Sequence, residues 1–266
     1  MLTLLGVGQG QNSSFDADYQ AVLNYATTQG YTPPSSSQQI LQNQLVLDLK
    51  SADIWDKLDT FAVFATDGDS NYALIDWKRL TQYTAVNSPT FTTNQGFKGN
   101  GVSSYIDTNF IPSAVSNNYQ LNNASFGYWC YSLFSNGGSR VNIGSRNSSS
   151  SGLTYAVGGN ENSLFMNTNN ITNGILSSVS SNLGLRHFNR TSSTGANYYK
   201  STGLVGSNTN TSFDLSNYSF YLFALNNAGT ASFYTLSDMS MAFAGADLSA
   251  ENTDLNNAFN TYITSL

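Results

Sequence analysis

Acidic side chains are the first candidates for chemistry, because glycoside hydrolysis needs two carboxylates that face each other across a groove. The sequence contains only two glutamates, Glu161 in a loop rich in Gly and Asn and Glu251 in the C-terminal segment. Asp107 and Asp238 lie on predicted strands, but each is the only acidic residue of its strand. The spacing therefore does not predict an enzyme, and we rank a degenerate hydrolase third among the possible functions.

Two further side chains could take part in catalysis. His187 is the only histidine and so the natural general base, and Cys130 is the only cysteine. Arg186 and Arg190 flank the histidine and would lower the pKa of its imidazole, and no Gly-x-Ser-x-Gly elbow supplies a nucleophile. We expect a strand histidine bonded to a neighbouring backbone group. We expect Cys130, in the apolar segment FGYWCYSLF, to be a buried and inert thiol.

The segment ATDGDSNYALIDWK is the best candidate for a metal site. Asp67, Asp69 and Asn71 occupy the first three odd positions of a calcium loop. The match then fails, because Tyr72 stands where that loop has glycine and Lys78 stands where it has a bidentate glutamate. An acidic turn that caps a strand explains the same residues. We predict no metal and no cofactor, and leave calcium binding by these three residues open.

Aromatic residues give the strongest indication of binding, because sugar rings stack on exposed Trp and Tyr and Asn side chains bond hydroxyl groups. Six of them lie near predicted loops or strand ends: Trp77, Tyr83, Tyr105, Tyr155, Tyr198 and Tyr199. Others are expected in a core or a subunit interface: Trp55, Tyr128, Trp129, Tyr131 and Phe220 to Phe223. For any single member of the first group, burial is favoured over exposure.

Charge is scarce throughout the sequence. Only 10% of its 266 residues are Asp, Glu, Lys or Arg, and the net charge is -6. Scattered basic residues argue against nucleic-acid binding, which needs clustered Lys or Arg. Interface centres are depleted of charge and enriched in Tyr, Phe and Met, so the composition favours assembly with copies of itself, for example as a trimer.

The first twelve residues, MLTLLGVGQGQN, lack the basic start and the long apolar run of a secretion signal. No segment approaches the roughly 18 apolar residues that span a bilayer, so we predict no membrane contact. Residues 1–12 read as a short apolar strand followed by a Gly-Gln tether. They are either a frayed terminus or an arm that docks into the sheet edge or groove of a partner, and we adopt the arm as the prediction.

Helical patterns are predicted near both ends of the chain. Asp16 is the expected N-cap of a helix that stops at Gly30, and Ser36 or Ser37 opens a second helix that runs to Lys50. Ser51 is the expected N-cap of a short turn. The last helix begins after Ser249 and buries Leu255, Phe259 and Tyr262, which lie at i, i+4 and i+7.

Short strands separated by Gly, Asn and Ser clusters fill the region between these helices. The predicted strands are Phe61–Ala65, Thr90–Thr93, Tyr105–Thr108, Ser125–Phe134, Arg140–Ser145, Gly152–Val157, Ser163–Asn167, Gly184–Arg190, Ala196–Lys200, Tyr218–Asn226 and Ser237–Ala244. They predict an all-β sandwich at residues 61–266, preceded by an arm at 1–15 and by a helical lead at 16–60 that packs on the sandwich.

Four segments carry a resemblance to a known family: GFKGNGVSSYIDTNF, NNASFGYWCYSLFS, LGLRHFNRTSSTGANYY and the segment from YSFYLFALNN to the end of the chain. Their succession resembles the concanavalin A-like jelly-roll of the laminin-G and lectin superfamily, in the version carried by structural proteins of tailed phages that infect Bacteroidetes. The resemblance covers residues 16 to 266. It implies a virion component, often oligomeric and sometimes glycan-binding, although this architecture hosts many unrelated tasks.

In the first of these segments, Tyr105, Asp107 and Asn109 are expected on one face of a strand, with Ile106 and Thr108 on the other. We interpret the segment as scaffold.

The whole sequence is interpreted as a non-enzymatic virion structural protein, such as a head fibre, capsid decoration or tail-fibre component, that attaches to other virion proteins through residues 1–12. The alternative is an adhesin domain that binds host surface glycans.

Overall fold

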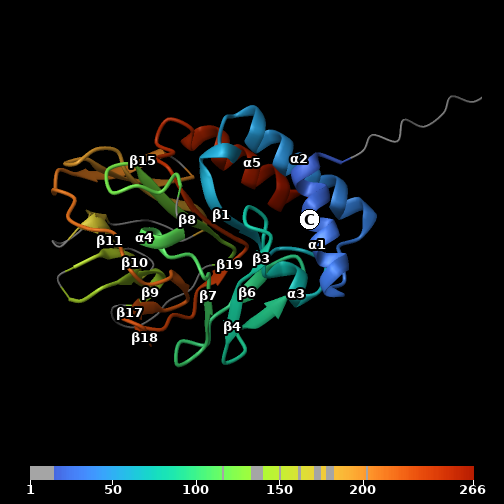
Figure 1. Cartoon of the computed structure of the whole chain (residues 1–266), viewed down its shortest axis with the longest axis horizontal. Helices are drawn as coiled ribbons and strands as arrows, with labels where there is room; N and C mark the ends of the chain where they lie inside the picture. Colours follow the sequence, from blue (N-terminus) through green and yellow to red (C-terminus); the bar gives the residue numbers. More distant parts are fainter. Residues whose placement is uncertain are drawn as a thin grey trace, which may run out of the picture.

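A computed structural model gives the fold of the chain (Figure 1). It describes residues 15–115, 117–132, 140–149, 151–160, 163–170, 175–177, 183–201 and 203–266, with the backbone alone at 115, 155, 157–160, 163–170 and 175–177. Two large sheets pack face to face, and helices cover one of them. The chain is an all-β jelly-roll sandwich with short N-terminal helices and a C-terminal helix, as the sequence predicts.

One layer is a six-stranded sheet in which every neighbouring pair is antiparallel. Its strands, in spatial order, are β1 (Leu58–Val63), β20 (Met241–Gly245), β8 (Ala124–Cys130), β13 (Gly184–Arg190), β14 (Ala196–Lys200) and β15 (Gly203–Asn208). The predicted bounds of β13 and β14 are confirmed at both ends. Among the described residues, the first strand therefore pairs with the last one, and β1 forms an edge of this sheet.

The second layer is a nine-stranded sheet. Its main path is β12 (Ile175–Ser177), β11 (Ser163–Asn170), β10 (Leu153–Asn160), β9 (Val141–Arg146), β16 (Tyr221–Leu222), β7 (Tyr105–Asp107) and β4 (Thr84–Val86). The hairpin of β17 (Leu225–Asn227) and β18 (Thr230–Ser232) joins it beside β9. Two small sheets complete the strands: β19 (Asp238–Met239), β6 (Gly96–Lys98) and β5 (Thr90–Thr92) in one, β2 (Ile75–Asp76) and β3 (Thr81–Gln82) in the other.

Alternating residues fill the space between the two layers. Phe126 and Phe188 point inward from the six-stranded sheet, and Ile106, Ile143 and Leu222 point inward from the nine-stranded one, all at most 2% exposed. Strand side chains alternate between faces, so Trp129 and Leu185, each three residues from one of these phenylalanines in β8 and β13, point outward instead. Apolar side chains from both layers thus form one core cluster inside the sandwich.

Three helices cover the outer face of the six-stranded sheet (Figure 1). They are α1 (Ala17–Gln29), α2 (Ser36–Ser51) and α5 (Asn252–Thr264), with a 3-10 turn, η1 (Trp55–Lys57), before β1. Leu255, Phe259 and Tyr262 are buried against the sheet, as predicted for the C-terminal helix. Shorter helices, α3 (Ser70–Ala73) and α4 (Pro112–Val115), lie in connections. No helix in the described part of the chain is long and apolar enough to cross a membrane.

Gln42 of α2 is the centre of a buried hydrogen-bond network at this junction. Its Oε1 accepts from the hydroxyl groups of Tyr19 (2.9 Å) and Tyr72 (2.7 Å). Its Nε2 donates to the Tyr262 hydroxyl (3.0 Å) and to Thr66 Oγ1 (3.2 Å). One fully buried amide therefore ties α1, α2 and α5 to the chain that leaves β1.

Helix ends differ from the prediction at three places. Asp16 and Gly30 cap α1 as expected, but Ser35 caps α2. Ser51 is no N-cap, because it still belongs to the last turn of α2. That turn ends when Asp53 takes a left-handed conformation (φ 56°) and the Ile54 amide donates to Leu49. Ser249 also fails as a cap, since its amide and hydroxyl bond to Asp247 and α5 begins three residues later.

Two predicted long strands are each split in two. Phe223 interrupts Tyr218–Asn226 with a φ of 68°, which separates β16 from β17. Ser240 interrupts Ser237–Ala244, so that β19 pairs with β6 while β20 enters the six-stranded sheet. Most expected core aromatics are buried. Tyr131 is the exception at 38% exposed, because β8 ends at Cys130.

Candidate functional site

The outer face of the nine-stranded sheet lies on the side of the sandwich away from the three long helices (Figure 1). The strand register places Asp107 opposite Tyr221, and Tyr221 opposite Gly144 of β9. Thr84 lies opposite Asp107 at one end of this row, and the backbone of Tyr155 lies opposite Gly144 at the other. A polar and aromatic row thus crosses five strands on one face.

Three tyrosines gather on this face, and we call Tyr105, Tyr221 and Tyr234 the tyrosine face. The rings of Tyr105 and Tyr221 stack at 4.4 Å between centroids with 28° between their planes. Tyr234 packs against Tyr105 at 6.4 Å. Tyr221 is only 7% exposed, whereas Tyr105 and Tyr234 are half-buried. The outer two rings therefore offer aromatic surface to a ligand, and the inner ring supports them.

Asp107 lies at the border of the tyrosine face. It is half-buried, and its Oδ1 accepts the Asn109 amide at 2.8 Å. Burial, followed by the charges of Asp107 and Tyr105, raises the pKa of Tyr221 well above its usual range. The Tyr221 hydroxyl therefore stays protonated at physiological pH, and a carboxylate acceptor lies beside it.

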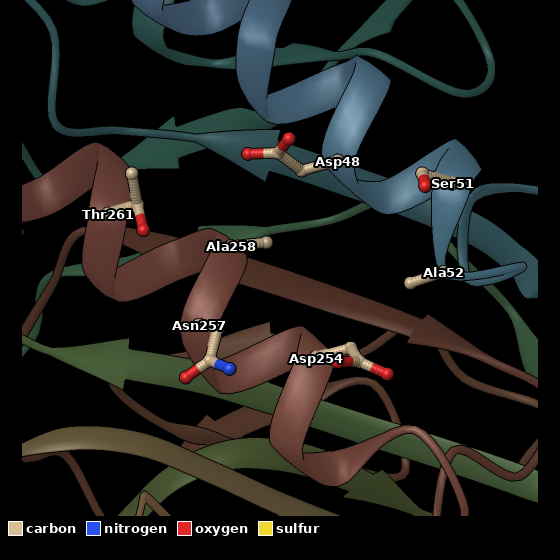
Figure 2. Close-up of a pocket in the computed structure, with 7 residues that line it drawn as sticks. All are labelled: Asp48, Ser51, Ala52, Asp254, Asn257, Ala258 and Thr261. Atoms are coloured by element: carbon tan, nitrogen blue, oxygen red, sulfur yellow. The ribbon is translucent and has the colours of Figure 1, made fainter.

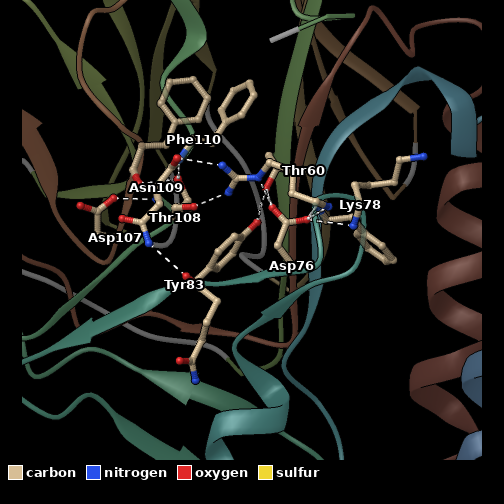
Figure 3. Close-up of polar contacts among 12 residues, drawn as sticks. Thr60, Asp76, Lys78, Tyr83, Asp107, Thr108, Asn109 and Phe110 are labelled. Carbon is tan, nitrogen blue, oxygen red and sulfur yellow. Dashed lines mark hydrogen bonds and ion pairs between the residues drawn. The ribbon is translucent and has the colours of Figure 1, made fainter. Parts of the chain in front are cut away.

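A buried ion pair fixes the turn that follows Asp107 (Figure 3). Asp76 is fully buried and pairs with Arg79 Nε at 2.5 Å. The other guanidinium nitrogens of Arg79 donate to the carbonyl oxygens of Thr108 (2.5 Å) and Asn109 (2.8 Å). An ion pair and two hydrogen bonds therefore fix the turn after Asp107, in addition to loop packing.

The same network ends on β1. Asp76 accepts the hydroxyl of Thr60 at 2.6 Å, and Thr60 in turn contacts the Tyr83 hydroxyl at 2.5 Å. Thr108 donates to the Phe220 carbonyl at 2.8 Å, just before β16. The segment that the sequence indicates as scaffold thus positions two strands of the tyrosine face.

The six aromatics predicted near loops do not gather at a single site. Trp77, Tyr83 and Tyr198 are buried, in agreement with the expectation of burial for any single member. Tyr105 and Tyr199 are half-buried, on opposite layers of the sandwich, and the Tyr155 side chain lies outside the described residues. Tyr221 belongs to the segment expected in a core or an interface, and its burial agrees with that expectation. Its contact with Tyr105 depends on pairing between strands about 115 residues apart, for which one sequence offers no signal. Nothing in the sequence singled out Tyr234.

His187 is not placed for general base catalysis. It is fully buried, and its ring nitrogens contact Asn252 Oδ1 (2.8 Å) and Asn189 Nδ2 (3.0 Å). The expected backbone partner is therefore wrong, and the partners are side-chain amides. Burial lowers its pKa to about 4. Arg186 and Arg190 point to the opposite face of β13, into the sandwich, so the predicted direction of the shift is right but its cause is not.

The remaining predicted residues hold the chain together. Asp69 accepts from the amides of Thr32 and Tyr72 and caps α3, and Asp67 accepts from Ser35. Within the described ranges, no group of three or more His, Cys, Asp or Glu side chains is placed to hold a metal ion. Calcium binding by Asp67, Asp69 and Asn71 stays an open prediction.

The other acidic and thiol candidates have structural partners. Glu251 forms an ion pair with Lys57 at 2.7 Å, and Glu161 lies outside the described residues. Asp238 accepts from the amides of Tyr131 (3.0 Å) and Ser132 (2.7 Å) after β8 ends. Cys130 is buried, and desolvation raises the pKa of its thiol. The expectation of an inert buried thiol agrees with this environment.

Among the described residues, the helices border two hollows that could hold a small ligand, and neither of the two suits a sugar ring. The first, about 290 Å³ between α2 and α5, carries Asp48 and Asp254 on its two walls (Figure 2). No aromatic ring lines it. The second, about 280 Å³, is lined by Asp18, Lys50, Asp53, Trp55 and Asp56. Trp55 is only 3% exposed there, so its ring offers little area for stacking. The tyrosine face is the better candidate.

Comparison with known proteins identifies the fold. No protein-family model matches the sequence, and no curated protein matches it. Among solved structures, a mutant of Trypanosoma rangeli sialidase displaying trans-sialidase activity aligns with 84% of this chain at 13% identity and a TM-score of 0.57. The botulinum neurotoxin serotype D binding domain aligns with 80% of it at 13% identity and a TM-score of 0.52.

These similarities support the β-sandwich fold and nothing finer, because identities this low show the fold alone. The alignment covers 39% of the sialidase chain and 52% of the toxin chain, so this chain spans about two fifths to one half of their lengths.

Proposed function

We propose that the chain is a non-enzymatic binding domain that holds a glycan on the tyrosine face. One observation carries the proposal: Tyr105 and Tyr234 present half-exposed rings on the sheet that the long helices leave uncovered, with the Asp107 carboxylate beside them. Aromatic rings stack on the apolar faces of sugars, and a carboxylate accepts hydrogen bonds from their hydroxyl groups. The burial of His187 between two amides supports the absence of catalysis at that position.

Ring-removing substitutions test this function. We expect glycans selected on an array to bind the wild-type chain, and Tyr105→Ala and Tyr234→Ala each to weaken Kd about fivefold, since an aromatic contact contributes about 1 kcal/mol. Tyr105→Phe should bind within about twofold of wild type, because it keeps the ring. Isothermal titration calorimetry measures both effects.

Tyr199→Ala is the matched control, because Tyr199 is half-buried on the other layer, where it stacks on His187 at 5.0 Å. Its affinity should equal that of wild type. Equal losses in the Tyr105 and Tyr199 variants, or no array signal at all, would contradict glycan binding at the tyrosine face.

We further propose that the chain serves as a structural component of a phage particle. The observation in favour is its low charge, 10% of residues, together with the resemblance of its segments to phage proteins. Surfaces with few charges can be buried against other copies of the chain or against other virion proteins without leaving charged side chains unpaired. In this proposal the chain forms an oligomer such as a trimer and attaches to the virion through residues 1–12.

Deletion of residues 1–12 tests the attachment. The shortened protein should keep its melting temperature and its oligomeric state but be absent from purified particles. Incorporation at the normal copy number would place the attachment elsewhere, and a monodisperse monomer at micromolar concentration in sedimentation would contradict assembly.

A further inference from the structure

Arg146, at the end of β9, lies on the same face as the tyrosine face. Gly144 pairs with Tyr221, and residues i and i+2 of a strand point to the same side. Arg146 is therefore displaced by about 7 Å along β9 from the row that contains Tyr221. Tyr221 therefore lies between Asp107 on β7 and Arg146 on β9, so a carboxylate and a cation flank it on its two neighbouring strands.

The guanidinium of Arg146 is held in a fixed orientation. Its Nε donates to Asn227 Oδ1 at 2.8 Å, across the parallel pairing of β9 and β17. Its carbon lies 5.9 Å from the ring centroid of Phe233, which is 43% exposed. Because Nε is bonded and one side of the plane faces the ring, the two terminal nitrogens are the donors left for a ligand.

No acidic side chain of the described residues neutralises this guanidinium. The four ion pairs found there use Lys50 twice, Lys57 once and Arg79 once. Arg146 thus differs from Arg79, whose charge is balanced by Asp76. A guanidinium that is oriented, half-buried and without a carboxylate counterion favours an anionic group, which it can bind through two parallel hydrogen bonds.

We infer that the ligand of the tyrosine face is an acidic sugar, and that Arg146 binds its carboxylate. The inference rests on the proposed glycan binding and adds the chemical class of the ligand and the orientation in which it binds. Tyr105 and Tyr234 stack against the sugar ring, and Arg146 pairs with the carboxylate. Asp107, on the β7 side of Tyr221, repels the acid group and accepts hydroxyl groups, so the sugar lies in one orientation across the strands.

Matched pairs of sugars test the inference by calorimetry. The probes are 3′-sialyllactose against lactose, and trigalacturonic acid against its methyl ester. In at least one pair, wild-type protein should bind the acidic member about tenfold more tightly. Arg146→Gln should reduce this ratio to about one and leave the affinity for the neutral member within twofold. Added NaCl should reduce the wild-type ratio, because salt screens exposed charges.

Lys98→Gln is the control, since Lys98 is an exposed cation on β6, outside the tyrosine face. It should keep the tenfold ratio. Equal affinity of the wild type for both members of each pair would overturn the acidic ligand while leaving glycan binding intact. A ratio that survives Arg146→Gln would overturn the role of Arg146. Failure of both acidic sugars to bind, while a neutral glycan from the array binds at the tyrosine face, would overturn the inference and leave the proposed function intact.

Discussion

At the scale of single residues, burial decides which side chains could do chemistry. His187 has the residue type of a general base, yet it is completely enclosed, contacts two amides and stacks on Tyr199. Charging such a ring costs free energy, because burial removes its water and its two partners are neutral amides instead of carboxylates. Its contribution is therefore to stability and not to catalysis.

The pKa of His187 predicts a pH dependence of folding. Burial lowers this pKa to about 4, below the ordinary value of 6.5, so the unfolded chain binds the proton more tightly. The contribution of neutral His187 should be complete above pH 6.5 and be lost as the pH falls toward 4, in total about 3 kcal/mol. Urea unfolding of the wild type at several pH values measures this loss.

His187→Gln provides the comparison, because a glutamine side chain does not titrate. Carboxylates titrate in both proteins, so the difference between the two stability curves isolates the histidine. The wild type should lose about 3 kcal/mol more than the variant between pH 6.5 and pH 4. Parallel curves would show that His187 is accessible to protons in the folded state.

At the scale of elements, polar contacts attach the helices to the sandwich. Gln42 accepts from two tyrosine hydroxyls and donates to a third and to Thr66, so every polar atom of its side chain is used. Removing one member of a buried network leaves the others without partners, at about 1 to 3 kcal/mol for each group.

We therefore expect Gln42→Leu to lower the free energy of unfolding by about 3 kcal/mol, although leucine is apolar and similar in size. Gln44→Leu is the control, because Gln44 is exposed on the same helix and bonds only to Asp48. That change should stay within about 0.5 kcal/mol. Equal effects in chemical denaturation would show that the network does not hold α2 on the sandwich.

Local sequence patterns predicted an element correctly where residues close in the sequence determine its ends. Asp16 and Gly30 cap α1 because a carboxylate accepts the first amides and glycine takes φ 74° without strain. The split at Phe223 could not be predicted, since a phenylalanine at φ 68° is held by surrounding packing and not favoured by its own preference. The tyrosine face was missed for a related reason, because its register joins distant strands.

At the scale of the whole molecule, the two layers have different surroundings. The six-stranded sheet is covered by helices on its outer face, and the nine-stranded sheet carries Tyr105, Tyr234 and Arg146 on its own. The two sheets therefore differ in what covers their outer faces. The helical layer packs on the sandwich, and in the proposed function the opposite face, whose β7 end is fixed by the Asp76 and Arg79 ion pair, presents side chains to the glycan.

The most direct test of this account is a crystal structure of the chain with the tightest ligand from the glycan array. We expect a sugar ring against Tyr105 and Tyr234, with hydroxyl groups near Asp107. A sugar bound in the hollow between α2 and α5, or on the six-stranded layer, would contradict it.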